Sequence, residues 1–232
     1  MAESPLPPFQ GFTAKAFAFL KDIDAHQTRE WFEVHKSIYE GELKGPMSAL
    51  VNSLGLSLAA RYIELACDPK RALFRIHRDV RFSKDKRPYK THIGASLTRD
   101  GERLAPGLLY VHIDPKGCFV AGGFYQPEPE ALQKIRRRMA DRPKDIRRLI
   151  VALAAAGHKL SDDEDALKRT PRGFEHVEDN DIARLLRMKS LVVRHPLSRK
   201  IAGDGDALIR AITDFAVTVH PLLRFGWAAI AA

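Results

Sequence analysis

The chain has 232 residues, of which 45% are hydrophobic, 29% charged and 8% aromatic, a composition typical of a soluble globular protein with a buried core. No run approaches the roughly 20 apolar residues that a membrane-spanning helix needs, and residues 1–8 lack the basic and apolar segments of a secretory signal. The only cysteines, Cys67 and Cys118, exclude a disulfide framework. We therefore expect a cytoplasmic protein that does not bind membranes.

The net charge of +9 is concentrated in two segments. Residues 70–90 hold nine basic and two acidic side chains, and residues 133–148 hold eight basic and two acidic ones. The rest of the chain is slightly acidic, with a net charge of −4. Such a concentration of basic residues can create a local positive field, provided that residues close in sequence are also close in space.

Apolar side chains recur at helical spacing through the first part of the chain. One predicted helix begins after Thr13 and a second after Thr28, because threonine is a favoured N-cap. A third follows the pair Gly45–Pro46, which we expect to separate it from the second. The sequence thus predicts an N-terminal helical block.

The spacing of apolar residues changes in the middle of the chain. Residues 72–82 alternate between apolar and polar, as in a half-buried strand, and residues 92–98 do the same. Residues 108–124 form a predicted β-hairpin around the turn at 114–117. After it we expect helices over 129–139, 143–156 and 181–187, a strand over 191–193, and a last helix opened by Gly203-Asp204-Gly205-Asp206.

Strands grouped between helical blocks are typical of an α+β fold. We expect one domain over residues 1–232, with an antiparallel or mixed sheet flanked by helices and with residues 1–8 as a flexible tail. No internal repeat or long linker divides the chain. The oligomeric state is left open.

The densest group of chemically useful side chains lies between Arg75 and His92. If residues 72–82 form a strand, one face carries Arg75, His77, Asp79 and Arg81. Guanidinium groups match phosphate and carboxylate geometry, and an imidazole or carboxylate between them can orient a guanidinium or take a proton. The polar loop that follows would let further side chains close over the same ligand, namely Lys86, Tyr89 and Lys90.

Two other interpretations of this segment remain open. In one, it is a surface strand whose arginines and aspartates pair with each other, each pair contributing little stability. In the other, the segment is helical, and the residues sharing a face are Arg75, Arg78, Asp79 and Phe82. A helix would be a weaker case for a site.

The same stretch carries a longer pattern, R-x-x-R-D-x-R-F followed by an Asp-Lys pair and a tyrosine. Its residues here are Arg75, Arg78, Asp79, Arg81, Phe82, Asp85, Lys86 and Tyr89. In this pattern the chain resembles an uncharacterised, mainly bacterial family of conserved proteins of similar length, catalogued as a domain of unknown function. Further matching segments are 9–12, 29–32, 122–123, 168–173 and 186–190. The resemblance implies no activity, but it favours a functional role for the Arg, Asp and Tyr side chains.

Three functions fit these residues. In the first, the protein binds a phosphorylated or other anionic small molecule through Arg75, Arg78, Arg81, Asp85, Lys86, Tyr89 and Lys90. If a reaction follows, Asp79 or His77 would be its acid/base, but no activated nucleophile is present and the question of an enzyme stays open. In the second, aromatic residues interleaved with basic ones bind nucleic acid. In the third, the motif is a structural ion-pair network.

Three histidines and two aspartates could converge on a metal ion across the predicted strands, namely His77, His92, His112, Asp79 and Asp114. No two of these histidines have the spacing of a metal motif, and the nearby cations oppose a dication. The common nucleotide, hydrolase and zinc motifs are also missing. We therefore expect no metal and no cofactor.

The second basic segment, residues 133–148, falls on predicted helices. Such runs are typically solvated helix faces whose arginine stems cover the edges of the core. Nucleic acid is a possible partner, but no helix-turn-helix, zinc-finger or RNA-recognition pattern supports it.

Overall fold

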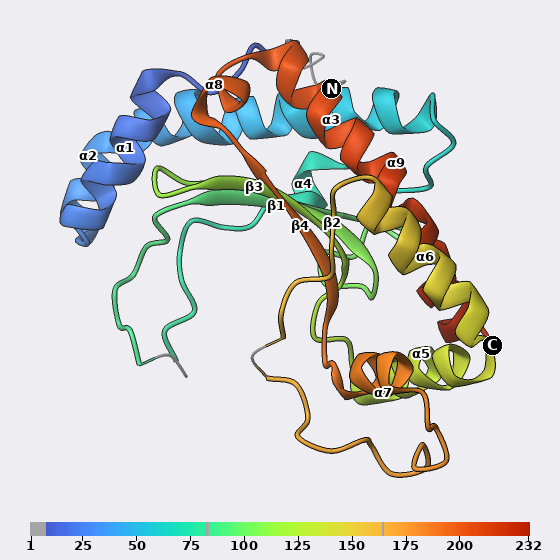
Figure 1. Ribbon diagram of the computed structural model, residues 1–232. Coiled ribbons are helices and arrows are strands. Elements are labelled where there is room, and N and C mark those ends of the chain that lie inside the picture. The colour runs from blue at the N-terminus through green and yellow to red at the C-terminus, as the bar shows by residue number, and fades with distance from the viewer. Residues whose placement is uncertain (1–7, 82–83, 164) are drawn as a thin grey trace.

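The computed structural model describes residues 8–81, 84–163 and 165–232. Figure 1 shows a four-stranded sheet with helices packed along one of its faces. The strands lie in the order β1 (Ile93–Thr98), β2 (Leu108–Ile113), β3 (Cys118–Phe124) and β4 (Leu191–Leu197), and each pairs antiparallel with the next. The predicted α+β fold is confirmed. Residues 1–7 of the predicted tail lie outside the described residues.

The N-terminal block begins with α1 (Ala14–Ala25) and α2 (Arg29–Tyr39). Both predicted caps are confirmed, because the hydroxyl of Thr13 accepts a hydrogen bond from the N–H of Ala16, and that of Thr28 from the N–H of Trp31. The predicted hairpin is also confirmed, with β2 and β3 joined by a turn in which the N–H of Gly117 donates to the C=O of Asp114.

The expected interruption at Gly45–Pro46 is wrong. Helix α2 continues through a π-helical segment, η1 (Glu40–Lys44), directly into α3 (Gly45–Ala59). A proline inside a regular helix lacks an N–H and crowds the carbonyl one turn earlier. In η1 the N–H of Gly45 donates to the C=O of Glu40, and this wider turn gives the proline ring room.

The remaining helices are α4 (Pro69–Ala72), α5 (Pro129–Asp141), α6 (Pro143–Ala155), α7 (Asn180–Arg187), α8 (Arg199–Ala202) and α9 (Gly205–Ile230). Those predicted over 129–139, 143–156 and 181–187 are confirmed as α5, α6 and α7. Asp204 caps α9 by accepting a hydrogen bond from the N–H of Ala207. Among the described helices, none combines the length and the apolar character needed to cross a membrane.

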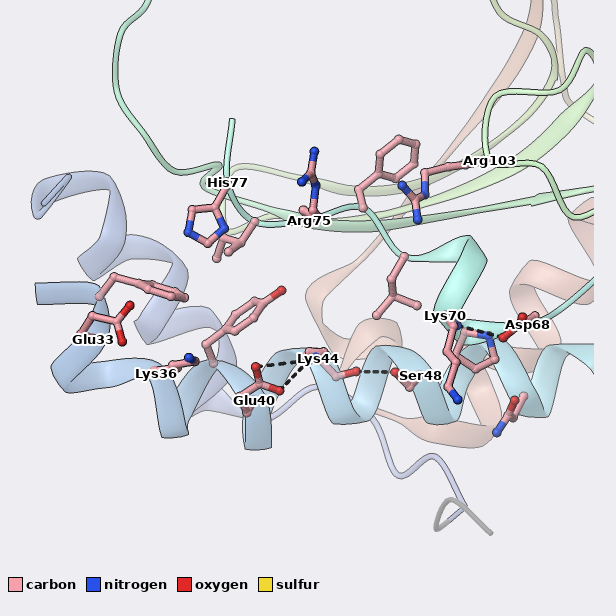
Figure 2. Close-up of a pocket in the computed structure, with 17 residues that line it drawn as sticks. Glu33, Lys36, Glu40, Lys44, Ser48, Asp68, Lys70, Arg75, His77 and Arg103 are labelled. Atoms are coloured by element: carbon pink, nitrogen blue, oxygen red, sulfur yellow. Dashed lines mark hydrogen bonds and ion pairs between the residues drawn. The ribbon is translucent and has the colours of Figure 1, made fainter. Parts of the chain in front are cut away.

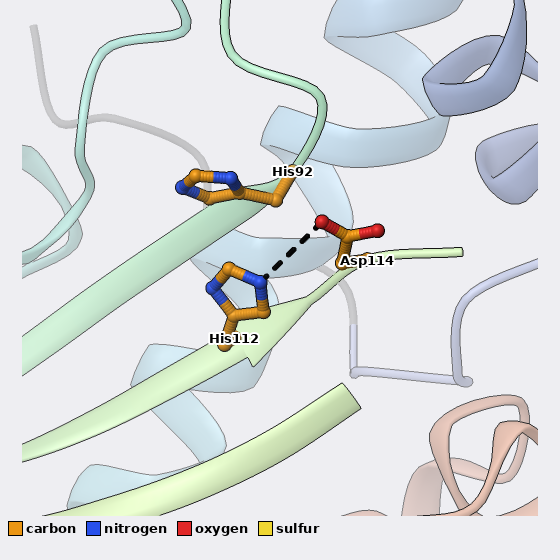
Figure 3. Close-up of side chains that lie close together, drawn as sticks. All are labelled: His92, His112 and Asp114. Atoms are coloured by element: carbon orange, nitrogen blue, oxygen red, sulfur yellow. Dashed lines mark ion pairs between the residues drawn. The ribbon is translucent and has the colours of Figure 1, made fainter. Parts of the chain in front are cut away.

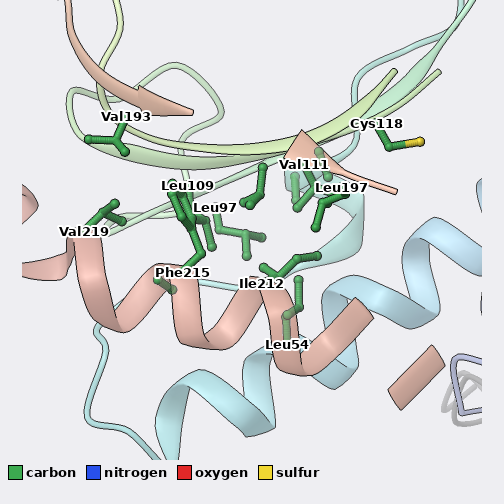
Figure 4. Close-up of a cluster of buried hydrophobic side chains, with 14 of the residues drawn as sticks. Leu54, Leu97, Leu109, Val111, Cys118, Val193, Leu197, Ile212, Phe215 and Val219 are labelled. Atoms are coloured by element: carbon green, nitrogen blue, oxygen red, sulfur yellow. The ribbon is translucent and has the colours of Figure 1, made fainter. Parts of the chain in front are cut away.

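One face of the sheet packs against α9 and α3 and forms the centre of the hydrophobic core (Figure 4). In β2, Leu109, Val111 and Ile113 point to this face and are buried, whereas the alternate residues are half-buried. The facing side chains of α9 are Ile212, Phe215 and Val219. Removing each such large apolar side chain from water contributes about 2 kcal/mol to stability.

The opposite face of the sheet, called here the open face, carries aromatic and polar side chains. Tyr110, His112 and Phe119 contact one another at ring-centroid distances of 4.5 to 5.8 Å. The guanidinium of Arg194 lies 3.6 Å from the centre of the Phe119 ring. Figure 1 shows two long excursions of the chain on this side, one between α4 and β1 and one between α6 and α7. The sheet thus separates an apolar face from a face that can carry a site.

The predicted strand over residues 72–82 is wrong. Residues 69–72 form α4, and the described residues after them, as far as Arg81, make only isolated bridges, Leu73 to Ala95 and His77 to Tyr89. Around the second bridge the N–H of Arg78 donates a hydrogen bond to the C=O of Pro88, and the N–H of Lys90 donates one to the C=O of Ile76. To continue the antiparallel pairing, residue 88 would have to donate a backbone hydrogen bond to the C=O of Arg78, and a proline has no N–H to donate. The pairing therefore stops, and the segment becomes a loop.

Candidate functional site

Residues 75–90, called here the motif loop, leave the sheet and return beside it (Figure 1). Although no regular strand forms, the predicted alternation persists. Arg75, His77, Asp79 and Arg81 are exposed, and Ile76 between the first two is buried. The motif residue Phe82 lies outside the described residues.

The outer part of the motif loop is held by a chain of ion pairs. The carboxylate of Asp85 contacts the guanidinium groups of Arg78 at 2.7 Å and Arg87 at 2.8 Å. Arg87 also contacts Asp24 of α1 at 2.8 Å, and Asp24 in turn contacts Lys116 of the β2–β3 turn at 2.8 Å. Hydrogen bonds from Arg87, together with the charge of Arg78, keep the pKa of Asp85 well below its usual range. These contacts fasten the loop to two other elements.

Asp79 and Arg81 form a second pair at the surface. The Nη2 of Arg81 donates to Asp79 Oδ2 at 2.7 Å and its Nε donates to Oδ1 at 3.0 Å. These hydrogen bonds lower the pKa of Asp79 to about 2. The carboxylate therefore remains ionised at neutral pH and accepts hydrogen bonds from its neighbour. Lys86 is also engaged locally, because its Nζ donates to the C=O of Val80 at 2.9 Å.

Tyr89 lies inside the protein. The residue is 2% exposed, and its ring stacks on that of Phe32 of α2 with 4.7 Å between ring centroids. The ring of His77 lies against both, at 5.1 Å from Tyr89 and 5.6 Å from Phe32. The N–H of Tyr89 donates to the side chain of Gln27. Burial raises the pKa of Tyr89. Tyr89 thus anchors the returning end of the motif loop to α2.

The base of the motif loop has a different electrostatic arrangement. The Nζ of Lys90 donates to the C=O of Arg75 at 2.7 Å, and it lies 5.3 Å from the centre of the Phe74 ring. The guanidinium of Arg103, from the β1–β2 connection, lies 5.5 Å from the same ring. Burial lowers the pKa of Lys90, and the charges of Arg75, Arg103 and Arg78 lower it further. We call Phe74, Arg75, Lys90 and Arg103 the Phe74 cluster.

A cavity of about 1030 Å³ lies between the continuous helix formed by α2, η1 and α3 and residues 68–77 (Figure 2). Its apolar lining consists of Phe32, Tyr39, Leu73, Phe74 and Ile76. Its basic side chains are Lys36, Lys44, Lys70, Arg75 and Arg103, and its acidic ones are Glu33, Glu40 and Asp68. Figure 2 shows the His77 ring turned towards α2, and the Arg75 side chain directed away from the helices.

The acidic side chains of this cavity are partly neutralised by local partners. Glu40 pairs with Lys44 at 2.9 Å, and Asp68 caps α4 by accepting a hydrogen bond from the N–H of Lys70. Within the described residues, Arg75 makes no ion pair. The cavity therefore combines an apolar wall with a surplus of positive charge, and it borders the Phe74 cluster through Phe74, Arg75 and Arg103.

His92, His112 and Asp114 meet at the edge of the open face (Figure 3). Ile93 pairs with Ile113 across β1 and β2, and His92 and Asp114 are the next residues beyond this pair, so that they lie close together. Burial and the neighbouring His92 lower the pKa of His112 to about 4, and burial lowers that of His92. The other residues weighed with them, His77 and Asp79, lie in the motif loop instead.

The second basic segment is only partly the solvated helix face that the sequence suggests. Arg136 of α5 is 7% exposed, and its Nη2 donates to the C=O of Met188 at 3.0 Å. Burial lowers the pKa of Arg136. The guanidinium of Arg138 lies 5.1 Å from the Phe225 ring of α9. Part of the charge at 133–148 therefore serves packing between helices.

The sequence identified Arg75 and Lys90 of the Phe74 cluster but not Arg103. The latter sits in a polar connection with no motif of its own, so only the folded chain brings it to Phe74. His92, His112 and Asp114 all lie on or beside predicted strands, but it is the pairing of β1 with β2 that brings them together, and the turn at 114–117 fixes only the pairing of β2 with β3.

Together these features define an α+β protein with a basic cavity next to an aromatic sheet face. Residues 15–225 match the model of the conserved hypothetical protein family DUF2461. Since this match covers most of the chain, the protein belongs to that family, and the resemblance to an uncharacterised conserved family is confirmed. No curated protein and no solved structure matches the chain.

Proposed function

We propose that the protein binds an anionic small molecule at the Phe74 cluster, with the adjacent cavity taking the rest of the ligand. The observation that supports this most is the unbalanced charge of Lys90 and Arg103 at the Phe74 ring, with Arg75 near enough to Lys90 to lower its pKa. Arg78 adds to the field at Lys90 even though Asp85 pairs with it. Like charges in such a partly dehydrated place repel by energies on the order of 1 kcal/mol per pair. A bound anion replaces that repulsion with attraction.

The chemistry of the cluster favours a phosphate or a carboxylate. Two guanidinium groups offer forked donors that match either anion, and Lys90 adds a point charge. The apolar wall formed by Phe32, Tyr39 and Leu73 suits the uncharged body of a small molecule, as most ligand sites do. The ligand class is therefore an organic phosphate or carboxylate.

The predicted site residues then fall into two roles. Arg75, Arg78 and Lys90 attract the anion, whereas Arg81, Asp85, Lys86 and Tyr89 hold the motif loop in place. Of the two predicted acid/base residues, His77 borders the cavity, while Asp79 is bonded to Arg81. If a reaction follows binding, His77 is in position to exchange a proton with the ligand.

A thermal-unfolding screen tests the proposal. The probes are pyrophosphate, sugar phosphates, nucleotides, dicarboxylates and short oligonucleotides, each at two salt concentrations. A small anion at about 100 times its dissociation constant would stabilise the protein by about 2.7 kcal/mol. Protection by oligonucleotides alone, with a steep loss at high salt, would instead indicate nucleic acid.

Variants localise the binding. Arg103→Gln should remove most of the protection by pyrophosphate. The matched control is Arg148→Gln on α6, whose side chain is 81% exposed, and it should behave as wild type. If no small anion protects the wild type, or if both variants respond equally, the proposed site is contradicted.

The ion-pair chain of the outer loop supports a second, structural role for the motif. Arg78, Asp85 and Arg87 connect the loop to Asp24 of α1 and, through it, to Lys116. This network would keep the base of the loop, and with it Arg75 and Lys90, at a fixed position. The structural role and the binding role are compatible, and substitutions in the two parts separate them.

A further inference from the structure

His92, His112 and Asp114 form a compact group outside the cavity described above. One ligand atom from each residue lies within 4.8 Å of the others, and His112 Nε2 is 3.6 Å from Asp114 Oδ2. Figure 3 shows the two imidazole rings lying one above the other, with the carboxylate beside them. In the part of the chain that the structure describes, no other three His, Cys, Asp or Glu side chains come together in this way.

Two of these side chains are held by partners that leave one atom facing the group. The Nδ1 of His112 is hydrogen-bonded to the hydroxyl of Tyr110 at 3.0 Å, so that its Nε2 faces Asp114. The Oδ1 of Asp114 accepts a hydrogen bond from the N–H of Lys116 at 2.7 Å, which leaves Oδ2 facing His112. Such outer partners orient the side chains that bind metal ions in proteins.

Gly94 makes room for the first of these partners. Gly94 pairs with His112 across β1 and β2, and a Cβ at this position would lie 2.5 Å from the Tyr110 hydroxyl. The absence of a side chain at Gly94 therefore allows Tyr110 to reach His112.

We infer that His92, His112 and Asp114 bind a divalent transition-metal ion. Two imidazole nitrogens and one carboxylate oxygen are ligands that suit Zn²⁺ and related ions. Ligand atoms around such an ion are about 3 to 3.5 Å apart, so the group needs to close by roughly 1 to 2 Å, which side-chain rotation can supply. Three protein ligands leave coordination positions for water or an anion.

An entry path exists. The side chains of His112 and Asp114 are 14% and 12% exposed, and Asp114 also lines a small cavity of about 240 Å³ together with Lys21, Thr91 and Lys116. The basic surroundings, which led us to expect no metal from the sequence, are real, since Lys90 and Arg78 lie near enough to lower the pKa of His92. The carboxylate of Asp114 opposes them. This site does not depend on the anion proposal.

The experiment uses the full chain freed of metal by chelator. Zn²⁺ is titrated in competition with a chromophoric chelator, and Co²⁺ is titrated by its visible absorption. We expect one equivalent of each ion to bind. His112→Gln and Asp114→Asn should each weaken Zn²⁺ binding by about 100-fold, and Tyr110→Phe by about 10-fold.

The matched control is His195→Gln. His195 lies 5.1 Å from His158, ring to ring, beside Phe215 on the core side of the sheet. Among the residues that the structure describes, this second histidine pair belongs to no group of three that could hold an ion, so the control should bind Zn²⁺ as wild type does. Thermal unfolding in chelator shows which variants are folded. If His112→Gln does not fold, Asp114→Asn tests the inference instead, because asparagine has nearly the same shape as aspartate. Absence of stoichiometric binding to wild type would overturn the inference, as would equal affinities for wild type and Asp114→Asn.

Discussion

In the outer part of the motif loop, from Arg78 to Arg87, arginines and aspartates pair with one another, whereas at its base Lys90 and Arg103 lie against the Phe74 ring. Arg75 acts on Lys90 from nearby, and among the described residues none of these three cations makes an ion pair. Both parts are rich in the same residue types. In the outer part each carboxylate accepts hydrogen bonds from an arginine, which lowers the pKa of the carboxylate. At the base the cations lower the pKa of Lys90 instead.

This difference shows how one basic motif can serve two purposes. Paired charges satisfy each other and give a loop a defined shape, at small net gain because they are exposed. Unpaired charges that face one another destabilise the free protein and favour a bound anion. The location of the carboxylates, which depends on the course of the loop, decides between the two.

The largest expected effect concerns stability below neutral pH. Burial lowers the pKa of His112 to about 4 and that of His92 as well. The unfolded chain takes up protons at these imidazoles near pH 6.5, and the folded chain does not. The free energy of unfolding should therefore fall as the pH drops from about 6.5 towards 4, by up to about 3 kcal/mol.

The carboxylates of the motif loop titrate elsewhere, because their pKa values are lowered and their contribution is lost only below about pH 4. Urea unfolding in chelator, at several pH values between about 7 and 4, separates the two effects. His112→Gln should flatten the profile in this range. A profile as steep as that of wild type would show that His112 is not the group responsible.

A smaller effect is expected from Asp85→Asn, which leaves Arg78 and Arg87 facing each other without the carboxylate between them. The unfolding temperature should fall by a few degrees, and proteases should cut the motif loop more readily. Affinity for pyrophosphate should change by less than about twofold, because the loss of a negative charge beside Arg78 favours the anion while the looser loop disfavours it. Asp145→Asn, whose ion pairs on α6 are 3.9 Å long and exposed, is the control and should be neutral.

The smallest effect expected is that of Lys90→Gln on metal binding. Removing a cation near His92 should tighten Zn²⁺ binding roughly threefold, while the same substitution weakens pyrophosphate binding. Lys90→Arg keeps the charge and should leave Zn²⁺ affinity near the wild-type value. Parallel changes in both affinities would show that Lys90 acts through the shape of the site and not through its charge.

Much of the fold could be predicted from the sequence, because caps, helical spacing and the turn at 114–117 are local signals. Residues 72–82 show where local signals fail. Over the described residues 72–81 their alternation was correct for burial, but a β-ladder also needs N–H groups on the partner segment, and Pro88 on the returning segment has none. Likewise, the pair Gly45–Pro46 is typical of a helix end, but the π-helical turn before it accommodates the proline and the helix continues.

The site was predictable in part for a related reason. The motif placed Arg75 and Lys90 in one segment, and both belong to the Phe74 cluster. Arg103 and the cavity wall from α2 come from distant parts of the chain, so no spacing in the sequence could reveal them. Arg136 shows the converse, since its segment looks like a solvated face and its side chain is buried against Met188.

The most direct measurement compares two arginines of the same motif by calorimetric titration with the best-binding anion of the screen. Arg75 belongs to the Phe74 cluster, and Arg81 is bonded to Asp79 in the outer loop. Our account predicts that Arg75→Gln weakens binding at least about 10-fold, or about 1.4 kcal/mol, and that Arg81→Gln changes it by less than about twofold. Equal losses in the two variants, or a loss only in Arg81→Gln, would contradict the assignment of binding to the base of the motif loop.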